Sequence, residues 1–152
     1  MNIVEVTQNR GALCAEILAT LPGWFGIPES NAGYERDVEA MPMFAAYDGA
    51  DALGFLALNR RTQHAIEIHV MGVRPTHHRS GTGRLLVVVA EAFARAQGAR
   101  FLTVKTLSPS RSDQGYAKTR AFYEALGFLP IEEFPLLWNP ENPALMLLKV
   151  LP

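Results

Sequence analysis

Two glycines stand one residue apart in a basic segment, HHRSGTGR, at residues 77–84. This segment follows a strand-like run at 65–73 and precedes a helix-like run at 85–97. Gly81 and Gly83 have no Cβ, so the backbone at either position can lie close to a bound group. The first turn of a helix carries unpaired N–H groups and the positive end of the helix dipole, which both favour a phosphate. The spacing therefore indicates a phosphate site, with a plain glycine-rich turn as the alternative.

Three arginines, Arg74, Arg79 and Arg84, lie in or beside this segment. A guanidinium pairs with phosphate oxygens through parallel hydrogen bonds, so these side chains could bind additional phosphate charge. Arginines that are simply solvated beside a turn are the alternative.

Two other classes of nucleotide site do not fit the sequence. A P-loop requires the pattern G-x-x-x-x-G-K-[ST], which the chain lacks. The dinucleotide fingerprint requires a third glycine where Leu86 stands, and an acidic residue about 20 positions further on, where the chain has Phe101. Both patterns are excluded.

Two further motifs accompany the glycine segment. VMGVRP, at 70–75, ends the preceding strand, and TRAFYEALGF, at 119–128, places a tyrosine four residues before Gly-Phe at the end of a helix. With the [Q/R]-x-x-G-x-[G/A] pattern at 78–83, these motifs resemble the GNAT superfamily of N-acetyltransferases in type, order and separation. The resemblance extends over nearly the whole chain. His78 departs from it, because the family usually has Gln or Arg at that position.

The resemblance implies that residues 77–84 bind the pyrophosphate of acetyl-CoA. It also implies that the end of the strand pairs with the pantetheine arm as an added strand would, and that one of its amides polarises the thioester carbonyl. The implied coenzyme A-binding residues are Met71, Gly72, Val73, His78, Arg79, Ser80, Gly81, Thr82, Gly83, Arg84, Thr119 and Tyr123. No metal is expected, since the pair His77 and His78 has no third ligand at a recognisable spacing.

Tyr123 matches the family tyrosine that protonates the departing coenzyme A thiolate. Tyr116, Thr119 and Tyr123 are spaced at i, i+3 and i+7, so they form one stripe of the helix. Phe122 and Leu126 form a neighbouring stripe, which we expect to face the core. A phenol beside the sulfur would stabilise the leaving group by proton donation or a hydrogen bond. A tyrosine that only packs is the alternative.

The strand at 65–73 offers two candidate bases. Residues two apart share one face of a strand, so Glu67 and His69 point the same way. An amine has an ordinary pKa of about 10 and must lose a proton before it attacks a thioester. Glu67 lies where some histone-acetylating relatives have their base, and imidazole titrates near neutrality. Either residue could serve, with Glu67 favoured over His69, and both could instead be half-exposed strand residues.

Cys14, the only cysteine, lies between Leu13 and Ala15 in a helix-like run. A small buried thiol is common at such a position. We therefore expect the acceptor to attack acetyl-CoA directly in a ternary complex, without an acyl-cysteine.

The hydrophobic pattern places these residues on a mixed set of elements. It predicts strands at 2–7, 64–73, 99–107, 128–138 and 144–151, a hairpin at 43–58, and helices at 10–20, from Ser30 or Asn31 to about 40, at 82–97, and from Ser112 or Asp113 to 126. The strand–helix–strand order around 65–107 requires a parallel pair with a right-handed crossover. We expect one N-acetyltransferase domain over 1–152, with a mostly antiparallel α/β sheet, a central parallel pair and helices on both faces.

Composition restricts the partners. The 152 residues are 49% hydrophobic and 19% charged, with a formal net charge of −1, which is typical of a globular protein and gives no overall attraction to nucleic acid or anionic membrane. One cysteine, no apolar leader and no long apolar run favour a soluble cytoplasmic protein.

The leading hypothesis is an acetyl-CoA-dependent N-acetyltransferase acting on a small-molecule or peptide amine. We expect the acceptor to enter beside residues 21–40 and 138–143, where aromatic and acidic residues are frequent. A non-catalytic acyl-CoA-binding domain on the same fold is the alternative. Exposed edge strands near the C-terminus would allow a homodimer.

Overall fold

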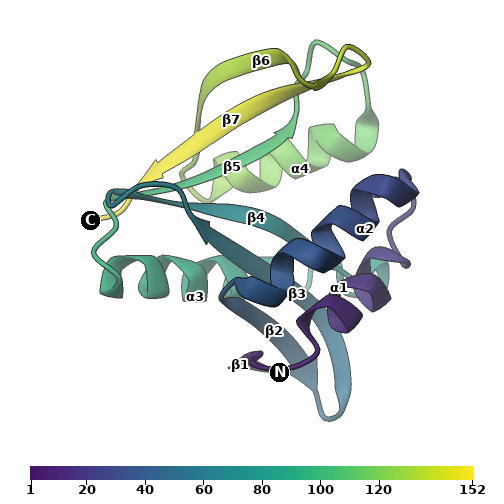
Figure 1. Ribbon diagram of the computed structural model, residues 1–152, viewed down its shortest axis with the longest axis vertical. Helices are drawn as coiled ribbons and strands as arrows, with labels where there is room; N and C mark the ends of the chain where they lie inside the picture. Colours follow the sequence, from purple (N-terminus) through teal and green to yellow (C-terminus); the bar gives the residue numbers. More distant parts are fainter. The chain divides into compact units, whose positions relative to one another are not determined.

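A computed structural model describes residues 1–152 and contains one seven-stranded sheet (Figure 1). The strands are β1 (Asn2–Glu5), β2 (Met43–Asp48), β3 (Asp51–Arg60), β4 (Ala65–Val73), β5 (Phe101–Leu107), β6 (Leu129–Asn139) and β7 (Asn142–Val150). The helices are α1 (Arg10–Leu18), α2 (Pro28–Asp37), α3 (Thr82–Ala96) and α4 (Gln114–Ala125), with short 3-10 helices η1 (Val38–Ala40) and η2 (Pro75–His77). The strand order is β1-β2-β3-β4-β5-β7-β6, and β4 and β5 are the parallel pair. This topology confirms the expected mixed α/β sheet.

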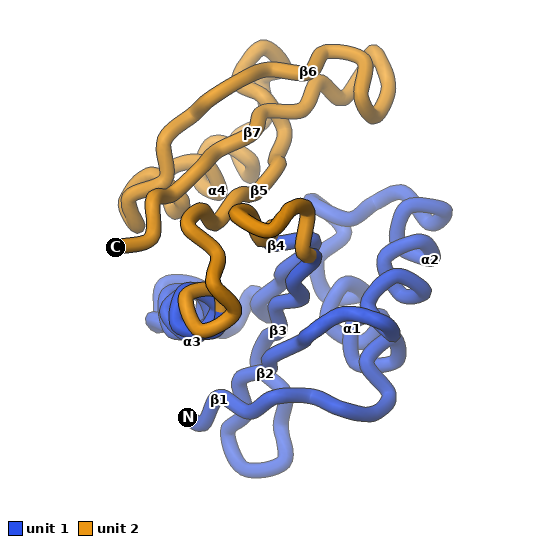
Figure 2. Tube along the Cα trace, turned by 60° about the vertical axis from the view of Figure 1, so that its left-hand side comes forward, with its two compact units in different colours: residues 1–59, 68–93 blue, residues 60–67, 94–152 orange.

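The chain divides into two compact units (Figure 2). Unit 1 comprises residues 1–59 and 68–93, and unit 2 comprises residues 60–67 and 94–152. None of the helices is long and apolar enough to cross a bilayer.

Unit 1 contains an antiparallel meander of β1, β2 and β3. The β2–β3 hairpin turns at Gly49, whose φ of 60° explains why glycine suits this position. One face of α1 contributes Ile17 and Leu18 to a core that also contains Phe55 of β3. The hairpin predicted at 43–58 and the helix predicted at 10–20 are confirmed.

The end of β4 is held by close packing on both sides within unit 1. A Cβ on Gly54 of β3 would lie 2.8 Å from the Gly72 carbonyl oxygen and 3.1 Å from the Val73 Cα, so only glycine fits there. A Cβ on Gly72 would lie 3.0 Å from Leu21 and 3.2 Å from Ile17. Close packing of this kind leaves little freedom to the backbone at Gly72 and Val73.

Unit 2 contains β5, β7 and β6, which pair antiparallel, together with α4. The Asp113 side chain accepts a hydrogen bond of 3.0 Å from the Tyr116 amide and caps the helix, as one of the two sequence alternatives predicted. Gly98 and Gly127 follow α3 and α4 with φ values of 82° and 96°, the left-handed conformation in which glycine commonly ends a helix.

Two local expectations were wrong. Neither Ser30 nor Asn31 caps the second helix, which begins at Pro28 because proline needs no amide partner at the first helical position. On α4, Tyr123 is the buried residue and Phe122 and Leu126 are only half-buried, so the buried face lies one position away from the predicted core stripe.

Candidate active site

The glycine segment contains two left-handed residues immediately before α3. Arg79 has a φ of 60° and Gly81 a φ of 88°. A left-handed conformation is unfavourable for arginine, and such residues are concentrated at functional sites. Alternation of this kind turns successive backbone N–H groups toward one side, which suits an anion. A Cβ on Gly81 would meet nothing within 4 Å, so the space beside this residue is open.

The side chains of this segment differ in whether their polar groups are free to bind a ligand. Ser80 donates to the His77 carbonyl oxygen at 2.5 Å, and its hydroxyl lies 2.8 Å from the buried Thr82 hydroxyl. These two residues can therefore offer a ligand mainly their backbone amides. Arg79 and Arg84 are exposed and can reach an anion. The amides at the start of α3 have no partner within the helix, which fits the pyrophosphate of coenzyme A.

His78 has a structural role that its place in the motif did not suggest. Its Nε2 lies 2.7 Å from the Val73 carbonyl oxygen, and its ring makes an edge contact with Trp24, with 5.6 Å between centroids. The imidazole thus ties the glycine segment to the end of β4. This contact brings together Val73 and His78, two residues of the predicted coenzyme A site.

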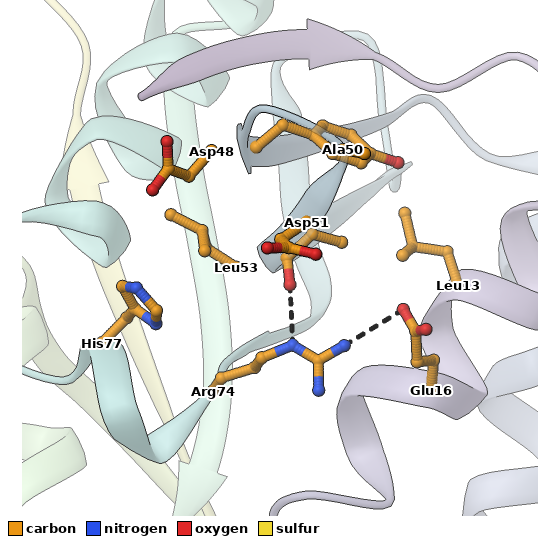
Figure 3. A pocket seen from close by; sticks show the side chains of 10 residues that line it. Leu13, Glu16, Asp48, Ala50, Asp51, Leu53, Arg74 and His77 are labelled. Atoms are coloured by element: carbon orange, nitrogen blue, oxygen red, sulfur yellow. Dashed lines mark hydrogen bonds and ion pairs between the residues drawn. The ribbon is translucent and has the colours of Figure 1, made fainter.

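Arg74 lies in a different environment from the other two arginines. Its Nε donates to the Ala52 carbonyl oxygen at 2.7 Å, and its guanidinium forms an ion pair of 3.2 Å with Glu16 (Figure 3). The arginine lines a pocket of about 400 Å³ with Asp51 and His77. Two of its nitrogens, Nε and Nη2, are thus engaged within the protein, which makes Arg74 a poorer candidate for a phosphate ligand than the exposed Arg79 and Arg84.

His69 is oriented by residues of α2. Its Nε2 lies 3.0 Å from the Asp37 Oδ2, and its ring makes an edge contact with Tyr34, with 5.6 Å between centroids. Its side chain is only 20% exposed. The sequence had placed His69 on a strand face but had given no sign of its carboxylate partner, which lies 32 residues earlier.

Glu67 is buried and engaged in ion pairs, contrary to the half-exposed alternative. Its Oε2 accepts a hydrogen bond of 2.5 Å from the Lys105 ammonium, and its Oε1 lies 3.9 Å from the Arg61 Nε. Glu67 is 6% exposed. The lone charge of Lys105 in an otherwise uncharged strand was the signal that could have revealed this partner.

Tyr123 lies in the interior against Phe122 and Phe128, with ring centroids 5.2 and 5.4 Å away. Burial, with a smaller contribution from Tyr116, raises the pKa of the Tyr123 phenol above its ordinary value. The phenol is therefore protonated at neutral pH. Thr119 donates to the Gly115 carbonyl oxygen at 3.2 Å, so its hydroxyl is bonded within α4.

Cys14 is fully buried in the core of unit 1. Burial, with a smaller contribution from Glu35, raises the pKa of its thiol from 9.0 to about 12. A thiol of this kind is neutral at physiological pH and is a poor nucleophile.

The raised Cys14 pKa predicts a loss of stability at alkaline pH. The folded state holds the thiol proton more tightly than the unfolded state does. The contribution of the protonated thiol to the free energy of unfolding is therefore complete below about pH 9, and it declines as the pH rises toward 12. We expect the difference in unfolding free energy between wild type and Cys14→Ala to shrink by on the order of 1 kcal/mol between about pH 8 and 10.5. Urea denaturation of both proteins measures this difference, and a constant difference would contradict the assignment.

Comparisons with known proteins agree with this architecture. The model of the acetyltransferase (GNAT) family matches residues 14–128. Similar solved structures include a GNAT-family protein from Desulfovibrio desulfuricans (18% identity, TM-score 0.84, 99% of each chain). They also include the aminoglycoside 6'-N-acetyltransferase from Enterococcus faecium (20% identity, TM-score 0.76, 100% of this chain and 98% of that one). A third is a GNAT-family acetyltransferase from Elizabethkingia anophelis with acetyl-CoA bound (14% identity, TM-score 0.77, 99% and 97%).

No curated protein matches the chain in sequence. At identities of 14 to 20%, the structural likeness shows the fold. The family model covers most of the 152 residues, from the middle of α1 to the end of the Y-x-x-x-G-F motif. This chain belongs to the GNAT acetyltransferase family.

Proposed function

We propose that this protein transfers the acetyl group of acetyl-CoA to the nitrogen of an amine acceptor, by direct attack in a ternary complex. The observation that carries the proposal is the backbone before α3, where left-handed Arg79 and Gly81 precede a helix N-terminus. We place the reaction in the cytoplasm, because a chain with one cysteine suits a reducing compartment.

Coenzyme A binding would use mainly the backbone. The amides of Thr82, Gly83 and Arg84 lie in the first turn of α3 and suit the pyrophosphate. The exposed Arg79 and Arg84 guanidinium groups suit the 3′-phosphate. The β4 backbone at Met71, Gly72 and Val73 would pair with the pantetheine arm, and one of its amides would polarise the thioester carbonyl.

His69 is the better of the two candidate bases. Glu67 is buried against the Lys105 ammonium, so taking up a proton would break an ion pair. His69 has one ring nitrogen on Asp37, which leaves the other to accept the proton of an acceptor amine. The new N–C bond forms as the C–S bond breaks.

Tyr123 is the proposed proton donor to the departing sulfur. Its raised pKa keeps the phenol protonated at the pH of the reaction. Its ring contacts with Phe122 and Phe128 hold it in one orientation, which favours a hydrogen bond to a leaving thiolate.

A cationic amine is the proposed class of acceptor. Helix α2 carries Glu29, Glu35 and Asp37, and its Tyr34 makes an edge contact with Phe25. Carboxylates beside aromatic rings attract ammonium groups. An aminoglycoside 6'-N-acetyltransferase is among the structurally similar proteins, which supports small polyamines and aminoglycosides as the first compounds to test.

Two measurements test this function. Acetyl-CoA should stabilise the protein against heat and NAD should not, since a ligand at 100 times its Kd adds about 2.7 kcal/mol. Thiol release with an amine panel should then require both the protein and an amine. Stabilisation by acetyl-CoA without amine-dependent thiol release would favour the alternative, a non-catalytic acyl-CoA-binding domain.

Replacing Arg79 by glycine should lower the affinity for coenzyme A without lowering the stability of the fold. Glycine adopts the left-handed conformation without a Cβ penalty of about 1 kcal/mol, so Arg79→Gly should be as stable as wild type or more stable. The loss of a phosphate partner should weaken coenzyme A binding by about 10-fold. Calorimetric titration and thermal denaturation measure the two effects, with Arg95→Gly, in the last turn of α3, as a control that leaves affinity unchanged. Unchanged affinity in Arg79→Gly would contradict the phosphate role.

Strand β6 supports a proposed homodimer. It lies at one edge of the sheet, and its pairing with β7 is irregular between Phe134 and Asn139. The backbone of residues 135–138 therefore has no regular strand partner, and an edge of this kind can pair with another chain. The exposed apolar side chains of β6 and β7 are Leu129, Ile131, Leu136, Leu137, Trp138 and Val150. We expect sedimentation to show a dimer that Leu136→Glu converts to a monomer. A monomeric wild type at micromolar concentration would contradict this proposal.

A further inference from the structure

We infer that Asp37 is a positioning residue that holds His69 in the tautomer able to act as a base. This inference rests on the proposed function, because it gives His69 its task. It adds a residue from α2, a helix to which the sequence assigned no catalytic part.

The tautomer follows from the geometry of the pair. The His69 Nε2 lies 3.0 Å from the Asp37 Oδ2. A carboxylate can only accept a hydrogen bond, so Nε2 must carry the hydrogen and donate it. In the neutral ring the lone pair then lies on Nδ1, which becomes the atom that can remove a proton from an amine.

Tyr34 restricts the same imidazole from a second direction. It precedes Asp37 by three residues on α2, so the two side chains lie on one face of the helix. Its ring meets the His69 ring at an interplanar angle of 77°, and Phe25 packs against Tyr34 in turn. One contact fixes which nitrogen is protonated, and the other limits rotation of the ring.

Asp37 is itself held by the residues that follow it. Val38 is fully buried in the core of unit 1. The Glu39 carboxylate accepts a hydrogen bond of 2.6 Å from the Gly11 amide, and the Glu39 carbonyl oxygen accepts one of 2.8 Å from Arg10. Although α2 has no buried residue, its C-terminal end is thus anchored to the start of α1. A fixed backbone beside Asp37 lets a half-exposed carboxylate orient the imidazole.

Nitrogen-15 NMR of the imidazole tests the tautomer without any assay of activity. At about pH 8.5, two units above the ordinary imidazole pKa of about 6.5, the ring of a free histidine is neutral. Wild-type His69 should show a protonated Nε2 and an unprotonated Nδ1. In Asp37→Asn, whose side chain can donate as well as accept, the shifts should move toward the averaged values of a mixed tautomer. Unchanged shifts in Asp37→Asn would overturn the inference.

Kinetics with an amine acceptor test what the tautomer does. Asp37→Asn should lower kcat about 10- to 100-fold with the KM for acetyl-CoA unchanged, and Asp37→Glu should recover most of the loss because it restores a carboxylate. Glu5→Gln removes an exposed carboxylate from β1 of the same unit and should have no effect. Wild type without turnover would contradict the proposed function itself. Turnover that Asp37→Asn leaves within twofold would contradict only the role of Asp37.

Discussion

His69→Ala should lower kcat by about 100-fold or more while leaving the affinity for acetyl-CoA within twofold. A positioned general base contributes about 10² to 10⁴ to the rate, and alanine removes both ring nitrogens. The imidazole contacts Asp37 and Tyr34, which both lie on α2 and outside the glycine segment before α3. Steady-state kinetics and calorimetric titration of acetyl-CoA separate the two effects.

Glu67→Gln is the comparison that distinguishes the two candidate bases. It leaves the Lys105 ammonium, whose side chain is 20% exposed, without its carboxylate, so the main expected effect is a lower stability to urea. The rate of the folded Glu67→Gln protein should fall much less than that of His69→Ala. A larger loss of kcat in Glu67→Gln at unchanged stability would identify Glu67 as the base and contradict our choice of His69.

Tyr123→Phe should lower kcat by about 100-fold with little change in stability below pH 10. Phenylalanine keeps the ring contacts with Phe122 and Phe128 and removes only the proton donor. The effect should be larger for acetyl-CoA than for an activated acetyl ester whose leaving group needs no proton. Kinetics with both donors measure this difference.

Tyr123→Phe should also change how the stability of the protein depends on pH in the alkaline range. Because burial raises the folded-state pKa of Tyr123, its contribution to stability is complete below the unfolded value of about 10 and is lost as the pH rises further. Tyr123→Phe removes this loss. Tyr47→Phe, in β2, is the control substitution and should leave kcat unchanged. An unchanged kcat in Tyr123→Phe would contradict the role of its phenol.

Most elements could be predicted from the sequence because their signals are local. Gly98 and Gly127 follow two helices and the Asp48–Asp51 turn closes a hairpin, which are the positions that these residue types favour. The start of α2 was mispredicted because a polar helix gives no hydrophobic period, and Pro28 outweighed the capping side chains two and three residues later.

The sequence predicted where the candidate site residues lie along the chain, but not which residues they pair with. The motif located the glycine segment and Tyr123, but the pairing of His69 with Asp37 joins residues 32 apart, and that of Lys105 with Glu67 joins residues 38 apart. Such contacts depend on how strands and helices pack, which periodicity does not encode. For the same reason, the use of His78 to hold Val73 and of Arg74 to hold Glu16 could not be foreseen.

The most direct test of the central claim is to quantify both products of one incubation. The protein is mixed with acetyl-CoA and a panel of cationic amines, and acetylated amine is measured by mass spectrometry while free coenzyme A is measured as thiol. We predict equal amounts of the two products for at least one amine, and neither product above background with His69→Ala. Acetyl-CoA that binds but yields no acetylated amine with any member of the panel would contradict the acetyltransferase assignment.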